Sequence, residues 1–118
     1  MAEGCVLNGA GIKPLRGLPN HVLQRAYAPL GALLPSCAGL VHPGGIGAMS
    51  LALAAGVPQV LLPCAHDQFD NAERLVRLGC GMRLGVPLRE QELRGALWRL
   101  LEDPAMAAAC RRFMELSQ

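Results

Sequence analysis

The chain has 118 residues, of which 52% are hydrophobic and 3% aromatic, and it carries a formal charge of +2. This length allows one domain with a modest core, and the high apolar share excludes a disordered segment. The arginines form no basic stripe, no apolar run reaches about 18 residues, and the N-terminus lacks a charged start followed by an apolar stretch. We therefore expect a cytoplasmic protein without nucleic-acid binding, a transmembrane segment or a signal peptide.

Short apolar runs alternate along the chain with segments of helical pattern. The expected strands are residues 5–8, 22–26, 39–41, 59–62 and 81–84. The expected helices are residues 29–35, 48–55, 70–78, 89–101 and 103–116. Strands that alternate with helices predict an α/β fold, a Rossmann-like parallel sheet with helices on both faces.

The helix expected from Asp70 shows signals at both ends. Asp70 is a suitable N-cap, and Gly79 stands at the position after the last helical residue, where a left-handed backbone is common. Within this helix we expect Leu75 and Leu78 to face the core. The last helix should open at Asp103-Pro104, since proline is favoured at the first helical position.

The five cysteines form no CxxC pair and are odd in number. Their spacing favours small apolar residues of a reduced protein over disulfides. The three histidines are not grouped with cysteines at zinc-finger spacing, so we expect no metal site.

A glycine-rich turn follows the apolar run that ends at Val41. The residues are His42-Pro43-Gly44-Gly45-Ile46-Gly47, and a helix of small residues, expected from Ala48 to Ala55, comes directly after them. This order places bare backbone N–H groups and the positive end of a helix dipole at the carboxyl edge of the sheet. It predicts an anion site there.

The strand at 59–62 leads to the same edge and ends in a polar loop with His66-Asp67-Gln68. A carboxylate next to an amide can accept from and donate to neighbouring sugar hydroxyls. Diphosphate on one loop and hydroxyls on the next are what a nucleotide sugar requires. On the residues alone, a solvated loop ahead of a helix capped by Asp70 remains the alternative.

These motifs resemble the donor-binding signature of UDP-glycosyltransferases with the GT-B fold, glycosyltransferase family 1. The likeness is greatest to the bacterial branch that includes rhamnosyltransferases, and it extends from about Val22 to Leu84. The residues that carry it are His42, the glycines after it, Gly56-Val57-Pro58, Pro63 and Asp67-Gln68.

The resemblance implies a role for each matching residue. His42 would donate to a donor phosphate, beside the backbone of Gly44, Gly45, Ile46 and Gly47. Asp67 and Gln68 would bind the sugar, with Asn71 supporting their loop. Tyr27, in a segment that matches a family Trp-x-Pro, would stack on the uracil or thymine base.

The resemblance also implies that this chain is the nucleotide-sugar-binding half, residues 1–118, of a two-domain enzyme. That enzyme would move a hexose from a UDP- or dTDP-sugar to an acceptor hydroxyl of a lipid or small molecule, with inversion and without a cofactor. The acceptor domain, with its general base, and the opening strand of the donor domain would lie outside the chain. The isolated chain would bind but not turn over, and its interdomain face would be free for self-association.

The chain departs from the family pattern at several positions. Pro43 stands where a second histidine is usual, Ala48 and Met49 where hydroxyl residues are usual, and Leu51 (or Ser50) where a ribose-binding Gln or Glu falls. These changes would fit a non-catalytic nucleotide-binding or partner domain. A nucleotide-sugar epimerase shares the fold, but Asp67-Gln68 argues against it. A dinucleotide-binding domain would need G-x-G-x-x-G after the strand, which the chain lacks.

Overall fold

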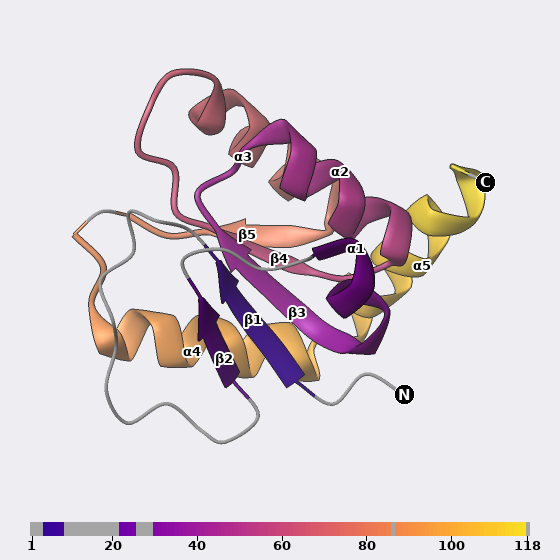
Figure 1. The fold of residues 1–118 in the computed structure, drawn as a ribbon, viewed down its shortest axis with the longest axis horizontal. Helices are drawn as coiled ribbons and strands as arrows, with labels where there is room; N and C mark the ends of the chain where they lie inside the picture. Colours follow the sequence, from indigo (N-terminus) through magenta and orange to yellow (C-terminus); the bar gives the residue numbers. More distant parts are fainter. Residues whose placement is uncertain (1–3, 9–21, 26–29, 86, 118) are drawn as a thin grey trace.

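A computed structural model describes residues 4–8, 22–25, 30–85 and 87–117. Five parallel strands form one sheet in the order β2-β1-β3-β4-β5 (Figure 1). The strands are β1 (Gly4–Asn8), β2 (Val22–Arg25), β3 (Cys37–His42), β4 (Gln59–Leu61) and β5 (Gly81–Arg83). The helices are α1 (Leu30–Leu33), the 3₁₀ turn η1 (Leu34–Ser36), α2 (Ile46–Ala55), α3 (Asp67–Leu78), α4 (Glu90–Glu102) and α5 (Pro104–Leu116).

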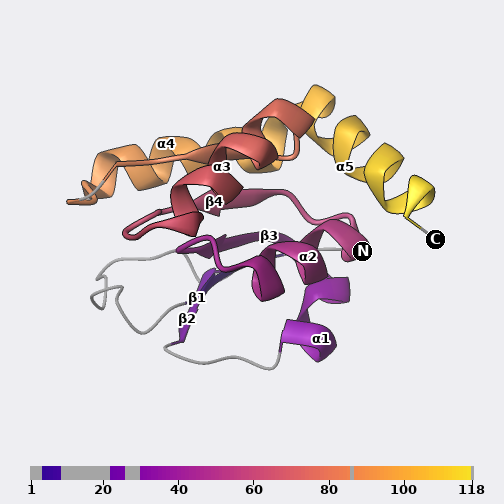
Figure 2. The same cartoon turned by 90° about the horizontal axis from the view of Figure 1, so that it is seen from above.

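Helices cover both faces of the sheet, as the alternating pattern predicts. On one face the predicted apolar stripe of α4 packs against the sheet, with Leu93, Leu97 and Leu100 buried beside Val41 and Val60. On the other face α1 and α2 cover β3, and α3 and α5 cover β4 and β5. Figure 2 shows α4 and α2 on opposite sides of β3. The predicted α/β fold is confirmed.

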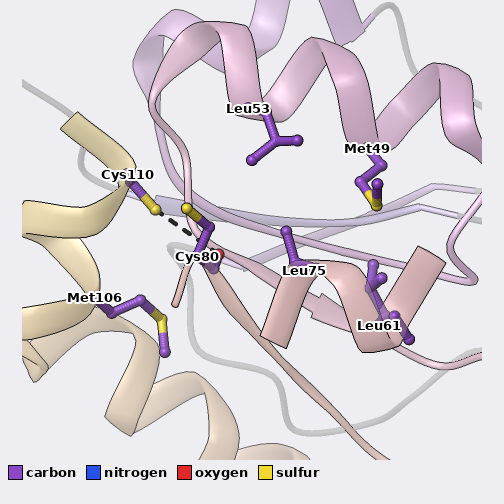
Figure 3. Close-up of a cluster of buried hydrophobic side chains, with 8 residues drawn as sticks. Met49, Leu53, Leu61, Leu75, Cys80, Met106 and Cys110 are labelled. Atoms are coloured by element: carbon purple, nitrogen blue, oxygen red, sulfur yellow. Dashed lines mark hydrogen bonds between the residues drawn. The ribbon is translucent and has the colours of Figure 1, made fainter. Parts of the chain in front are cut away.

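Small and sulfur-containing side chains fill the core beneath α5. Cys80, at the start of β5, and Cys110, on α5, lie buried side by side with Met106 and Leu75 (Figure 3). Burial raises the pKa of the Cys110 thiol to about 12, which keeps it protonated. Three of the cysteines thus act as the small apolar residues that their spacing predicts. Cys64 differs because it is exposed, and the side chain of Cys5 lies outside the described part.

The ends of the later helices follow the capping signals. Gly79 adopts the left-handed conformation (φ 77°) at the end of α3. Asp103 caps α5 by accepting from the amides of Ala105 and Met106, ahead of Pro104 in the first turn. Among the described residues, no helix is both long and apolar enough to cross a membrane.

Two helices begin earlier than their sequences suggest. Helix α2 starts at Ile46 rather than Ala48, so only Pro43, Gly44 and Gly45 separate it from β3, which extends to His42. Helix α3 starts at Asp67 rather than Asp70, and His66 occupies the N-cap position. A turn through Ala65 and His66 starts the helix early, because the Gln68 and Phe69 amides donate to their carbonyls.

The early start of α3 corrects two predictions. Asp70 lies inside the first turn and does not cap the helix. Leu75 is fully buried, as expected, but Leu78 is 42% exposed and does not face the core.

Candidate functional site

The two polar motifs lie at the same edge of the sheet. Strands β3 and β4 run in parallel, and His42 is the register partner of Leu61. The chain turns from His42 into α2, and from Leu61 through a loop into α3. The N-termini of both helices therefore reach the carboxyl edge of neighbouring strands, which is the usual ligand edge of such sheets.

His42 points into the protein rather than towards a ligand. Its side chain is 1% exposed. The ring Nδ1 accepts from the Gly44 amide at 3.1 Å, and the ring Nε2 lies 2.6 Å from Oε1 of Gln59. Burial lowers the pKa of His42, and the hydrogen bond to Gln59 opposes this only in part, so the ring is neutral. Both ring nitrogens are thus engaged inside the protein, and the phosphate contact of His42 stays a prediction.

Gly44 has a backbone that glycine alone adopts readily. Its φ is 110°, and a Cβ there would lie 3.3 Å from the backbone oxygen of Gln68. The Gly44 carbonyl accepts from Nδ2 of Asn71, a buried side chain of α3, at 2.9 Å. The glycine turn and the start of α3 are therefore tied together. Asn71 therefore holds the glycine turn, rather than the loop of Asp67 and Gln68 as predicted for it.

The N-terminus of α2 is left open to solvent. Gly45 is the N-cap, makes no side-chain capping bond, and is followed by no acidic residue in the first turn. In the described part of the chain, the amides of Gly45, Ile46 and Gly47 have no acceptor, and all three residues are exposed. Free amides at the positive end of a helix dipole form a binding site for an anion. The open amides support the anion site predicted for the glycine turn, which stays a prediction.

Asp67 and Gln68 lie in the first turn of α3 rather than in a loop. Asp67 is exposed and its carboxylate is free to accept from a ligand hydroxyl. Gln68 is half-buried, and its Oε1 accepts from the amides of Cys64 (2.9 Å) and Ala65 (3.2 Å). Gln68 therefore shapes the loop before α3, with only its Nε2 hydrogens left for a ligand. His66 in that loop has a positive φ of 34°, which a non-glycine residue rarely adopts.

The remaining predicted positions differ in what the structure says of them. Tyr27 lies outside the described residues. Ser50 and Leu51 are both exposed on α2, whereas Met49 is buried in the core with α3 and α5. Met49 stands where the family pattern has a hydroxyl residue, and it is part of the core. The described residues include no group of three side chains suited to hold a metal ion.

Gln59 is the residue of this site that the sequence reading missed. It is fully buried in β4, where it joins the His42 ring to the Met49 carbonyl. Its signal was a lone amide within the apolar run Val57 to Leu62, where a buried polar side chain needs partners.

Comparison with known proteins places this chain in a family. A family model described as "Erythromycin biosynthesis protein CIII-like, C-terminal domain" matches residues 5–117. Aklavinone 7-beta-L-rhodosaminyltransferase of Streptomyces galilaeus is 44% identical over 101 residues, which cover 83% of this chain and 22% of that protein. The 3-alpha-mycarosylerythronolide B desosaminyl transferase of Saccharopolyspora erythraea is 38% identical over 105 residues, 88% of this chain and 25% of that protein.

Solved structures agree with this assignment. The glycosyltransferase VinC in complex with DTDP matches with a TM-score of 0.80 and 29% identity, over 98% of this chain and 37% of that one. Spinosyn forosaminyltransferase SpnP matches with a TM-score of 0.76 and 32% identity, over 95% of this chain and 29% of that one. The chain spans about a quarter of the length of the curated relatives, and the likeness to rhamnosyltransferases in particular stays a prediction. The chain belongs to the family of erythromycin biosynthesis protein CIII-like C-terminal domains, which are found in GT-B glycosyltransferases.

Proposed function

We propose that this chain is the nucleotide-sugar-binding domain of an inverting glycosyltransferase that moves a deoxyhexose from a dTDP- or UDP-sugar to an acceptor hydroxyl of a small molecule. The observation that carries the proposal is the open N-terminus of α2, where the amides of Gly45, Ile46 and Gly47 find no acceptor among the described residues. Family membership supports it, and the VinC complex with DTDP favours dTDP over UDP.

The diphosphate binds to backbone rather than to the His42 ring. The amides of Gly45–Gly47 and the dipole of α2 face the anion, while His42 holds the turn from inside. As the sugar leaves, negative charge grows on the diphosphate, and preorganised N–H groups stabilise that charge without a metal ion. The domain thus contributes to catalysis through its leaving-group site.

The sugar lies against the first turn of α3. The carboxylate of Asp67 accepts from its hydroxyls, and Nε2 of Gln68 donates to a neighbouring oxygen. This assignment is supported by the contact between the glycine turn and α3, because Asn71 donates to the Gly44 carbonyl and Asp67 lies four residues before it, at the start of the same helix. The relatives named above are rhodosaminyl and desosaminyl transferases, which favours a deoxysugar here.

The rest of the enzyme supplies the acceptor and the general base. Exposed apolar side chains next to the site, Ile46 on α2 and Phe69 on α3, are 55% and 40% exposed. An acceptor domain that covers the site would bury them. Without an acceptor domain, the face that carries Ile46 and Phe69 is available for self-association of the chain.

Calorimetry with four ligands tests this function: dTDP, UDP, dTDP-glucose and NAD. We expect dTDP to bind and NAD not to bind, and we expect Asp67→Ala to weaken dTDP-glucose by roughly 1–2 kcal/mol, one or two hydrogen bonds, with dTDP unchanged. Gln68→Ala should also lower the melting temperature, because the Cys64 and Ala65 amides lose their acceptor.

Two outcomes would contradict the function. Binding of NAD without binding of either diphosphate would exclude a nucleotide-sugar site. Equal weakening of dTDP and dTDP-glucose by Asp67→Ala would remove Asp67 from the sugar site and leave it a purely structural role.

A further inference from the structure

We propose that Gln59 is a positioning residue for the diphosphate site, acting through the ring of His42. The inference rests on the proposed function of the glycine turn and assigns a role to a strand residue that does not itself reach the ligand.

A series of hydrogen bonds links Gly44 to α2 through His42 and Gln59, and the direction of each bond is fixed. The Gly44 amide can only donate, so Nδ1 of His42 must be unprotonated, and the neutral ring carries its proton on Nε2. That N–H donates to Oε1 of Gln59 over 2.6 Å. The Gln59 amide then donates from Nε2 to the Met49 carbonyl over 3.3 Å. If the Gln59 amide were turned over, its N–H would face the Nε2–H of His42, and its oxygen would face the Met49 carbonyl oxygen.

The hydrogen bonds form a closed ring around the turn. The Met49 amide donates to the Gly45 carbonyl as the first bond of α2. The path therefore runs from Gly44 through His42, Gln59 and Met49 back to Gly45. Asn71 fixes the remaining Gly44 carbonyl. With these inward-facing groups held, the amides from Gly45 to Gly47 remain free for an anion, as seen in the described part of the chain.

Burial makes this arrangement depend on Gln59. His42 and Gln59 are 1% and 0% exposed, so water cannot replace a lost partner. Around the imidazole ring of His42, α2 and β4 carry no ionisable side chain. The first turn of α3 brings only the exposed carboxylates Asp67 and Asp70. Among the described elements on this face, Gln59 is thus the side chain that selects the Nε2–H tautomer and thereby keeps Nδ1 free for Gly44.

The first test compares Gln59→Met, which is similar in volume but has no amide, with Gln91→Met on the exposed face of α4 as the matched control. Nitrogen NMR of the imidazole reports the tautomer in the free protein, and calorimetry reports the dissociation constant for dTDP. We expect Gln59→Met to lose the uniform Nε2–H tautomer, shift the Gly44 amide resonance and weaken dTDP roughly tenfold, about one hydrogen bond. Gln91→Met should change neither.

The second variant, Gln59→Glu, keeps the acceptor for Nε2–H and adds a charge that raises the pKa of His42. Once the imidazolium forms, Nδ1 carries a proton and faces the Gly44 amide donor. The ratio of the mutant to the wild-type dissociation constant for dTDP should therefore stay near its lowest value at high pH and rise as the pH falls. The ligand phosphate titrates in the same way in both measurements, so its effect on the dissociation constant drops out of the ratio. A role of Gln59 in packing alone would give a ratio that does not vary with pH.

Each failure has its own meaning. An unchanged tautomer or an unchanged dTDP affinity in folded Gln59→Met, or a flat ratio for Gln59→Glu, overturns the role of Gln59. A wild-type protein that binds neither dTDP nor UDP overturns the proposed function instead, and the tautomer measurement in the free protein still decides whether Gln59 positions His42.

Discussion

At the scale of single residues, the site depends on backbone groups whose positions are fixed by buried side chains. His42 and Asn71 both bind Gly44, one at its amide and the other at its carbonyl. Neither needs to touch a ligand to matter for binding. A histidine beside a glycine turn resembles a phosphate ligand in sequence, but burial of its ring gives it an internal role here.

The neutral state of buried His42 makes the stability of the fold depend on pH. Its pKa is lowered from 6.5, so between that lower value and 6.5 the unfolded chain binds more protons than the folded one. The stabilisation is complete above pH 6.5 and is lost as the pH falls from 6.5 through the lowered pKa. The free energy of unfolding should therefore fall more steeply over this window in the wild type than in His42→Asn, which cannot titrate.

Urea unfolding at about pH 7.5 and about pH 5.5 measures this difference, with His66→Gln as the control for an exposed histidine. The control measures how far removal of an exposed histidine changes that loss of stability. A wild type and a His42→Asn variant with equal slopes would show that His42 is not buried in its neutral form.

The sequence predicted the parts of the site that follow from local order and missed those that depend on packing. The glycine turn and its helix were predictable because the turn follows directly from local order, strand then glycines then small residues. Gln59 was not, since its partners are His42, 17 positions away, and Met49, 10 positions away. Only the packing of β4 beside β3 and beneath α2 brings them together. The same limit applies to the ring of His42, whose direction is set by that packing.

At the scale of elements, α3 begins before the capping residue predicted for it, Asp70. The turn through Ala65 and His66 and the bond from the Cys64 amide to Gln68 start the helix locally, and Asn71 ties its first turns to the glycine turn. These local bonds and one long-range contact therefore decide the first turn. The later helices, with Leu93, Leu97 and Leu100 on α4 and the Asp103 cap of α5, follow their sequences because their signals are local and consistent.

Strand β5 depends on a glycine that allows two elements to approach. A Cβ on Gly81 would collide with the Gln59 carbonyl of β4 and the Leu75 side chain of α3. Gly95 lies in the middle of α4 and is exposed to solvent. A Cβ there would meet nothing within 4 Å, so alanine fits. We expect Gly81→Ala to lower the free energy of unfolding by about 1–3 kcal/mol, and Gly95→Ala to raise it by about 0.5–1 kcal/mol.

Urea unfolding of the two alanine variants gives both values, and Gly95→Ala serves as the matched control. Effects of the same sign at both positions would contradict the close approach of β4, β5 and α3.

At the scale of the whole molecule, the chain is a sheet covered on both faces, and the proposed ligand edge lies where β3 and β4 end. The fold was predictable because strand and helix patterns alternate from residue 22 to residue 101. The chain spans about a quarter of its curated relatives, so its share of the proposed reaction is to hold the donor. In the proposed function, the diphosphate binds to the amides at the start of α2 that have no acceptor among the described residues.

Two substitutions at Gly45 test that claim most directly. Gly45 has an ordinary φ of −63° at the N-cap and open space around its Cβ position, so both Asp and Asn fit. Each should cap α2 and leave the melting temperature equal or higher, because both are good N-cap residues. They differ in charge. An Asp carboxylate about 4 Å from a phosphate repels it by up to roughly 4 kcal/mol near a protein surface.

The measurement is the calorimetric dissociation constant for dTDP in the wild type, Gly45→Asn and Gly45→Asp. We expect Gly45→Asp to weaken dTDP at least about tenfold more than Gly45→Asn does, with no loss of thermal stability. Equal affinity of the two variants, or a weaker dTDP complex only in a variant that melts lower, would contradict a diphosphate site at the N-terminus of α2.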